Sequence, residues 1–277
     1  MIFGLFVWIL TAGLYAPVFI VLYGSRWETI DYTHAYFILP LSLYFVWRDR
    51  RKYPSLVENL PVFKSFWPLL GLVSGLSLFI FAWKQEYLFL STLSLIPVLC
   101  GLTCYLYGRK IFQAVAFPIF YLLFLVPPPL GVLDEITVPM RYGVSVATEF
   151  VLKMLGYPLS RQGLMLFVGS HEVFLGAACS GFRSLITLAS LGSAYIYLTQ
   201  GSLTKKIGMA AAIVPLALAG NLMRVMSVCV ATYYLGESKG WRLFHDLSGF
   251  LMFGVMIGGL MGVERMLEKI KIGSKLK

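Results

Sequence analysis

The chain has 277 residues, of which 58% are hydrophobic and only 13% are charged. Soluble domains average about 45 to 50% apolar and about 25% charged residues, so this composition excludes an ordinary soluble protein and predicts an integral membrane protein. The formal net charge of +10 does not by itself indicate nucleic acid, because Lys and Arg collect in the cytoplasmic loops of membrane proteins. We therefore expect the lipid bilayer as a partner, and no nucleic acid.

Eight apolar stretches recur along the chain, and most approach the roughly 20 residues that a membrane-spanning helix needs. They cover residues 1–23, 33–47, 66–83, 86–107, 110–126, 180–199, 207–233 and 245–264. The first stretch lacks the basic start and the cleavage site of a secretory signal peptide, so we expect it to remain as a membrane helix. The sequence therefore predicts an all-α integral membrane protein with about eight transmembrane helices, in which residues 1–277 form a single domain.

Basic residues follow every second apolar stretch, and this pattern predicts the orientation of the chain. They cluster within residues 48–64, 109–110, 205–206 and 269–277. Positive charge near helix ends is retained on the cytoplasmic side of a membrane, so we expect these segments and both termini in the cytoplasm. The segments expected on the outer side are residues 25–32, 83–86, 127–178 and 236–244.

The longest outer segment, residues 127–178, begins with three consecutive prolines that end the fifth apolar stretch. Residues 133–155 mix apolar positions with five charged side chains, which predicts an amphipathic helix lying at the membrane interface. Residues 163–175 alternate in character and contain the turn sequence Gly-Ser-His-Glu, which predicts a short external β-hairpin. A ninth membrane crossing within residues 127–178 is the alternative.

Cys179 follows this hairpin, in the sequence Gly-Ala-Ala-Cys-Ser-Gly-Phe-Arg that leads into the sixth apolar stretch. The N–H groups and the dipole of a helix N-terminus favour negative charge, so we expect a lowered pKa and a reactive thiol at this position. Cys100, Cys104 and Cys229 lie within apolar stretches, where we expect buried thiols. Their spacing indicates neither a disulfide framework nor a metal-binding CxxC pair, and we expect no metal and no cofactor.

Two further side chains are expected at the depth of Cys179. Arg224 lies about 17 residues, or roughly 25 Å, beyond the predicted cytoplasmic start of the seventh stretch, with Asn221 on the same helix face. His245 opens the eighth stretch at its outer end. A charge within an apolar stretch is costly and tends to mark a functional site, and the three groups together fit an activated nucleophile. The structural alternatives are a packed cysteine, a snorkelling arginine and an interfacial histidine.

Several segments of the chain, in order, resemble the exosortase and archaeosortase family of integral membrane cysteine transpeptidases. The central segments are Ala-Cys-Ser-Gly-Phe-Arg-Ser at residues 178–184, Asn-Leu-Met-Arg-Val at 221–225 and His-Asp-Leu-Ser-Gly-Phe at 245–250. Upstream, the resemblance includes Asp31, His34, Pro40, Trp47, Arg48 and residues 124–129. It implies that Cys179 is the nucleophile, Arg224 the stabilising cation and His245 the acid or base.

The resemblance also implies a substrate and a location. Members of the family act on membrane-anchored surface proteins with a PEP-CTERM-like C-terminal sorting signal, which combines a short motif, a membrane helix and a basic tail. The implied reaction cuts near the motif on the extracytoplasmic side of the bacterial inner membrane, through a thioester. It passes the protein to an unknown acceptor, such as a lipid, a glycan or an amine, in systems linked to exopolysaccharide or surface assembly.

Five residues are candidates for substrate binding or for support of the site. Arg183 either supports the site, by lowering the pKa of the thiol or by pairing with a substrate carboxylate, or anchors its helix at the interface. Both interpretations stay open. Ser180 and Asn221 belong to the segments that carry the resemblance. Asp31 and His34 are expected on the outer side, where they line the entrance or anchor the interface.

Two questions about the reaction are not decided by the residues. Hydrolysis by a membrane cysteine protease and transfer by a transpeptidase require the same residues, so the sequence does not separate them. The competing class is a non-enzymatic membrane transporter, or an assembly scaffold for exopolysaccharide or surface export, in which Arg224 binds an anionic partner. Inverted repeats and paired broken helices would indicate a transporter, and the sequence contains no such repeat.

Overall fold

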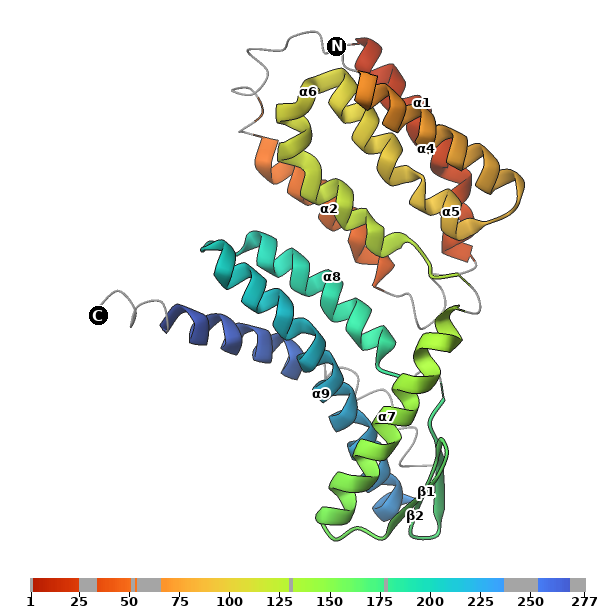
Figure 1. The fold of residues 1–277 in the computed structure, drawn as a ribbon, viewed down its shortest axis with the longest axis vertical. Helices are drawn as coiled ribbons and strands as arrows, with labels where there is room; N and C mark the ends of the chain where they lie inside the picture. Colours follow the sequence, from red (N-terminus) through yellow and green to blue (C-terminus); the bar gives the residue numbers. More distant parts are fainter. Residues whose placement is uncertain are drawn as a thin grey trace. The chain divides into compact units, whose positions relative to one another are not determined.

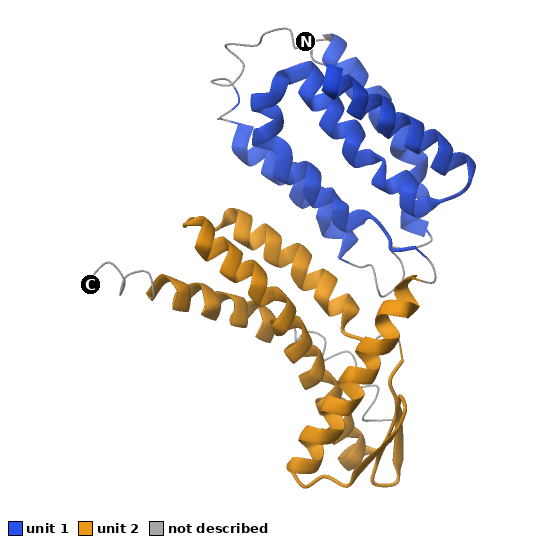
Figure 2. Cartoon of the chain, in the orientation of Figure 1, with its two compact units in different colours: residues 1–129 blue, residues 130–277 orange. Residues whose placement is uncertain are grey.

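The computed structural model describes residues 2–24, 34–50, 53, 66–129, 132–176, 179–236 and 254–269. The chain forms two compact units, residues 1–129 and residues 130–277 (Figure 2). Helices dominate both units, and the one sheet among the described residues has three strands. An all-α fold with a small β element is therefore confirmed, while the single domain over residues 1–277 stays a prediction.

The first unit consists of helices that coincide with the first five apolar stretches. They are α1 (Ile2–Leu22), α2 (Ala35–Asp49), α4 (Phe66–Lys84), α5 (Leu88–Leu93), α6 (Leu95–Tyr121) and the 3-10 helix Leu122–Leu125. Large apolar side chains such as Phe6 and Trp67 are exposed on these helices. Helices that are apolar all round belong in the core of a large protein or in a bilayer, which fits the membrane assignment.

The break expected between the fourth and fifth apolar stretches occurs within α6, at Gly108. This residue has φ +81° and ψ 171°, which interrupts the helical backbone. A side chain would clash with the backbone at such a positive φ, so glycine is the residue that allows the turn. Figure 1 shows the chain turning back on itself at this point of α6.

Four of the described helices are long and apolar enough to cross a membrane: Phe3–Leu22, Phe66–Lys84, Leu88–Leu125 and Leu203–Leu235. They support a membrane protein but do not confirm eight spans. One reason is length, because α2 has 15 residues and α8 (Phe182–Leu198) has 17, against the roughly 20 that a perpendicular span requires. Another is that Leu88–Leu125 contains both the fourth and the fifth expected stretch and counts once. Part of the eighth expected stretch, at residues 245–253, lies outside the described residues.

The second unit begins with α7 (Val132–Met154), which confirms the amphipathic helix expected at residues 133–155. Its buried positions, Thr137, Arg141, Val144, Ser145, Thr148 and Leu152, recur every three or four residues and therefore form one face. The helix is not among the four candidate spans. Its position at the membrane interface stays a prediction.

A three-stranded antiparallel sheet follows α7, with β1 (Leu159–Gln162), β2 (Met165–Val168) and β3 (His171–Phe174) in that order. The expected hairpin is β2–β3, in which Val168 pairs with His171 around the two-residue turn at Gly169 and Ser170. The additional strand β1 was not expected. It pairs with β2 through a second two-residue turn, and the Glu149 carboxylate of α7 accepts a hydrogen bond from its Arg161 side chain at 3.0 Å.

The helix α9 (Leu203–Leu235) organises the second unit. Its 33 residues correspond to roughly 50 Å, more than the hydrocarbon thickness of about 30 Å. Along its length α9 contacts α8, α7, β2 and β3, and Figure 1 shows α8 running beside its N-terminal half. Near its C-terminal end, the rings of Tyr233 and Tyr234 pack against that of Tyr157. A further helix covers residues 254–269.

Candidate active site

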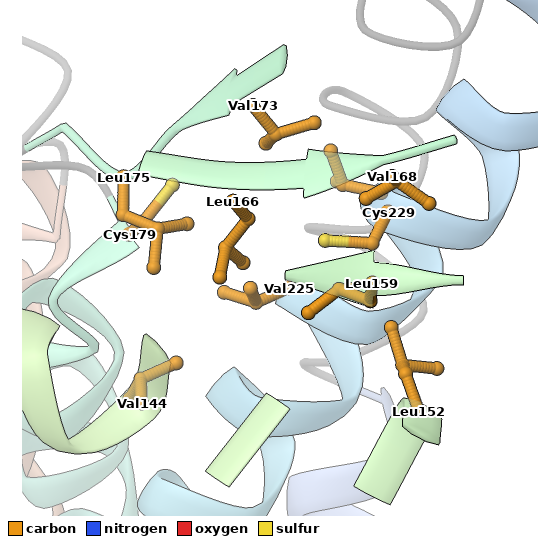
Figure 3. Close-up of a cluster of buried hydrophobic side chains, with 11 residues drawn as sticks. Val144, Leu152, Leu159, Leu166, Val168, Val173, Leu175, Cys179, Val225 and Cys229 are labelled. Carbon is orange, nitrogen blue, oxygen red and sulfur yellow. The ribbon is translucent and has the colours of Figure 1, made fainter. Parts of the chain in front are cut away.

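Cys179 lies between β3 and α8, in the core of the second unit. It is 7% exposed, and its backbone N–H donates to the Gly176 carbonyl at 2.9 Å. The surrounding cluster combines α7, the sheet and α9 (Figure 3), with Val144, Leu152, Leu159, Leu166, Val168, Val173, Leu175, Val225, Val228 and Cys229. The thiol therefore occupies the junction of three elements that are distant in sequence.

The start of α8 differs from the expected arrangement. The helix begins at Phe182, and its N-cap is Gly181, which has φ +77° in the left-handed region. Ser180 is buried, and its Oγ accepts a hydrogen bond from the Phe182 N–H at 3.2 Å. Ser180 therefore satisfies a backbone donor at the start of α8, while Cys179 lies two residues before the N-cap rather than in the first turn.

Burial is the largest influence on the Cys179 thiol, and it raises the pKa above its ordinary value. A thiolate is poorly solvated among apolar side chains, so the neutral form is favoured. The charge of Arg224, a hydrogen bond with the Gly176 backbone and the charge of Arg141 act in the opposite direction. The expectation of a lowered pKa is therefore wrong, because desolvation outweighs the groups that favour the thiolate.

Asn221 connects α9 to the loop that carries Cys179. Its Nδ2 donates to the Cys179 carbonyl oxygen at 3.0 Å, and its side chain is completely buried. Only the NH2 group of an amide can donate to a carbonyl, so Nδ2 faces the Cys179 carbonyl and Oδ1 points away from it. Among the described residues, Oδ1 has no hydrogen-bond partner. The structure thus brings Asn221 directly to the predicted nucleophile.

Gly181 is a residue of the site that the sequence analysis missed. A Cβ atom at this position would lie 2.9 Å from the Cγ of Asn221, and the positive φ also disfavours a side chain. Close approach of the loop to Asn221 therefore requires glycine. The available signal was its place directly after Cys179 and Ser180, at the point where the helix begins.

Arg224 lies on α9 one turn after Asn221, on the same buried face, and is 8% exposed. Its positive charge acts on the Cys179 thiol and favours the thiolate. The catalytic role of Arg224 stays a prediction. Arg183 lies partly buried in the first turn of α8. This position does not distinguish support of the site from anchoring of the helix at the interface.

A second buried arginine, Arg141, reaches the same region from α7 and was also missed. It is 9% exposed, its Nε donates to the Thr137 carbonyl at 3.4 Å, and its charge acts on Cys179. The sequence contained a signal, because Arg141 precedes Val144 by three residues and so shares the apolar face of the amphipathic helix.

The structure does not test the roles of three predicted residues. His245 and Asp31 lie outside the described residues. His34 is buried directly before α2, in the first unit. Their roles as acid or base and as entrance residues stay predictions. In the described ranges, no group of three His, Cys, Asp or Glu side chains could hold a metal ion.

The fold and the site define a helical membrane protein with a buried thiol, Cys179. The side-chain amide of Asn221 binds the backbone of this cysteine, and the charges of Arg224 and Arg141 act on its thiol. The family model of the transmembrane exosortases (Exosortase_EpsH) matches residues 27–262, which is most of the chain. No curated protein and no solved structure matches the chain. The protein belongs to the transmembrane exosortase family, as its sequence motifs indicate.

Proposed function

We propose that this protein is a membrane-embedded cysteine transpeptidase that cleaves the C-terminal sorting signals of surface proteins and transfers them to an acceptor. The family assignment supports a role in membrane protein sorting. The observation that carries the chemical proposal is the hydrogen bond from Asn221 to the Cys179 carbonyl. It holds the loop of Cys179 against the helix that carries Arg224, which supports a joint role of this thiol and this cation.

The first step is attack by Cys179 on a peptide carbonyl of the sorting signal. Because burial raises the pKa of the Cys179 thiol, the resting group is protonated near neutral pH, and the proton must leave as the sulfur attacks. We assign His245 as the base that accepts it. The new S–C bond creates a tetrahedral oxyanion, and the Arg224 guanidinium stabilises its charge.

Collapse of this intermediate breaks the C–N bond and leaves a thioester on Cys179. His245 returns its proton to the leaving amine, which departs with the membrane helix and the basic tail of the signal. A lipid, glycan or amine nucleophile then attacks the thioester, and the Cys179 thiol is regenerated. Water in place of the acceptor gives hydrolysis with the same residues.

We place the reaction on the extracytoplasmic side of the bacterial inner membrane, with both termini in the cytoplasm. The distribution of Lys and Arg between alternate loops supports this orientation. In the same proposal, Arg183 contacts the substrate or anchors α8.

The test is co-expression with a membrane-anchored protein that carries such a sorting signal, followed by mass spectrometry of its new C-terminus. The wild type should produce a shortened product, with added mass if an acceptor is joined and a free carboxylate if water is used. Cys179→Ala should produce none. Cys229→Ala is the matched control, because it removes another buried thiol of the same cluster and should retain processing. Normal processing by Cys179→Ala would refute the proposal.

A further inference from the structure

Arg141 carries a positive charge into the interior of the second unit without an equally buried counter-charge. In the part of the chain that the structure describes, its ion-pair partner is Asp134, whose carboxylate is 3.8 Å away and 78% exposed. An exposed carboxylate is well solvated and compensates a buried cation weakly. Burying a charge is costly unless it is paired, so packing alone does not account for arginine at this position.

The position of Arg141 on α7 directs it toward the thiol cluster. Val144 is one helical turn further along the same face and belongs to the cluster that contains Cys179 and Val225. The helix α7 contacts α9, which carries Arg224. The two guanidinium groups therefore approach the region of Cys179 from different helices.

We propose that Arg141 is a second cation of the active site, which acts with Arg224 to stabilise the negative charge that forms at Cys179. The charge is first that of the thiolate and then that of the tetrahedral oxyanion. A guanidinium keeps its proton at any accessible pH, so Arg141 contributes electrostatically and transfers no proton. The role in catalysis rests on the proposed function, whereas the effect on the thiol is independent of any substrate.

The other described groups around Cys179 leave few electrostatic alternatives. The sheet contributes the apolar side chains of Leu159, Leu166, Val168 and Val173 to the cluster. From α9 come Arg224 and the thiol of Cys229, and from the start of α8 comes Arg183. Asp134 lies beside Arg141, toward solvent. Arg141 is thus the cation that α7 adds to this region, and its removal should leave the other groups in place.

The expected effect is an upward shift of the Cys179 titration when the charge is removed. Loss of one nearby cation corresponds to a shift of about half to one pH unit, or about three- to tenfold less thiolate below the midpoint. Lysine restores the charge without the planar fork, so it should recover most of the thiolate population. A merely structural Arg141 would affect folding and leave the titration unchanged.

The experiment measures the rate at which iodoacetamide alkylates Cys179 in the full-length protein in detergent, followed on the Cys179 peptide by mass spectrometry. The pH range is about 6 to 11, on both sides of the ordinary thiol pKa of about 8.5. Arg141→Gln should shift the rate profile to higher pH, and Arg141→Lys should return it toward the wild type. Lys153→Gln is the matched control, because it removes a cation of the same helix that is half exposed and bound to Glu149.

Three outcomes decide the inference. A shift in Arg141→Gln with rescue by lysine supports it. Superimposable profiles for Arg141→Gln and the wild type overturn it, and so does an equal shift in Lys153→Gln. If Arg141→Gln does not fold, Arg141→Met provides the neutral side chain of similar length, with folding checked by thermal denaturation. Because no sorting substrate is present, failure here is distinct from failure of the transpeptidase proposal.

Discussion

Replacement of Asn221 by leucine tests how the loop that carries Cys179 is held in place. Leucine has nearly the shape of asparagine, so the packing against Gly181 is retained while both polar ends of the side chain are lost. The Cys179 carbonyl loses its 3.0 Å hydrogen bond, and the buried Oδ1 without a described partner disappears as well.

These two changes act on stability in opposite directions. Loss of a donor to a buried carbonyl costs about 1 to 3 kcal/mol, and removal of an unsatisfied buried acceptor returns a similar amount. The free energy of unfolding should therefore change by no more than about 1 to 2 kcal/mol. Activity should fall much further, because a displacement of about 1 Å at a reacting group can lower the rate by about 100-fold.

The assay pairs thermal denaturation in detergent with the rate of sorting-signal cleavage. Thr232→Val is the control, since it changes another buried polar residue of α9 that has no hydrogen bond to Cys179, and it should retain activity. Asn221→Asp should destabilise the protein more than leucine does, because an ionised carboxylate would face the Cys179 carbonyl oxygen. Wild-type cleavage by Asn221→Leu would refute the positioning role.

Four further predictions concern the same unit. Gly181→Ala should lower stability by about 1 to 3 kcal/mol, because the left-handed conformation is unfavourable with a Cβ that would also lie 2.9 Å from Asn221; an unchanged melting temperature would contradict this. Because burial raises the pKa of Cys179, alkylation of this thiol should keep accelerating above the ordinary pKa of about 8.5, and a plateau below that pH would show a different environment. Lys205→Met should lower stability by about 1 to 3 kcal/mol in thermal denaturation, because Lys205 pairs at 2.7 and 2.6 Å with two carboxylates of residues 254–269; no change would mean that these pairs contribute nothing. A membrane-impermeant thiol reagent should label Cys179 from the outer side, and labelling from the cytoplasmic side alone would invert the orientation.

Much of the fold follows from the sequence because membrane helices have a simple composition. Long apolar stretches could be assigned to helices without tertiary information, and the break at Gly108 was visible as a basic pair between two of them. The count of spans was harder to predict. The helices α2 and α8 are apolar but short, so their composition does not decide whether they cross the bilayer alone.

The strand β1 was missed for a similar reason. Its sequence, Leu-Ser-Arg-Gln, contains one apolar residue, and only pairing with β2 makes it a strand. Short strands with a single buried position give almost no periodic signal. The hairpin β2–β3 was predictable because alternation and turn residues occur together around Gly169.

Part of the site geometry could be predicted, but its electrostatics could not. Asn221 reaches the Cys179 carbonyl and Arg224 lies one turn later on the same buried face of α9, as the helix phase indicated, while their depth in a membrane and their catalytic roles stay predictions. The pKa of Cys179 was assigned the wrong direction because the sequence does not show that the thiol is buried within an apolar cluster of the second unit. Arg141 was missed because charged residues of an amphipathic helix are normally assigned to the solvent side, although its spacing from Val144 places it on the apolar face.

In the proposed mechanism Cys179 forms a thioester with the substrate, and this intermediate can be trapped. The purified protein would be mixed with a sorting-signal substrate, quenched in acid and digested, and the Cys179 peptide examined by mass spectrometry. We expect an acyl adduct on Cys179 that hydroxylamine removes, and none on Cys229. Two results together would contradict the thioester mechanism: cleavage by the wild type without an adduct on Cys179, and cleavage by Cys179→Ala at an undiminished rate.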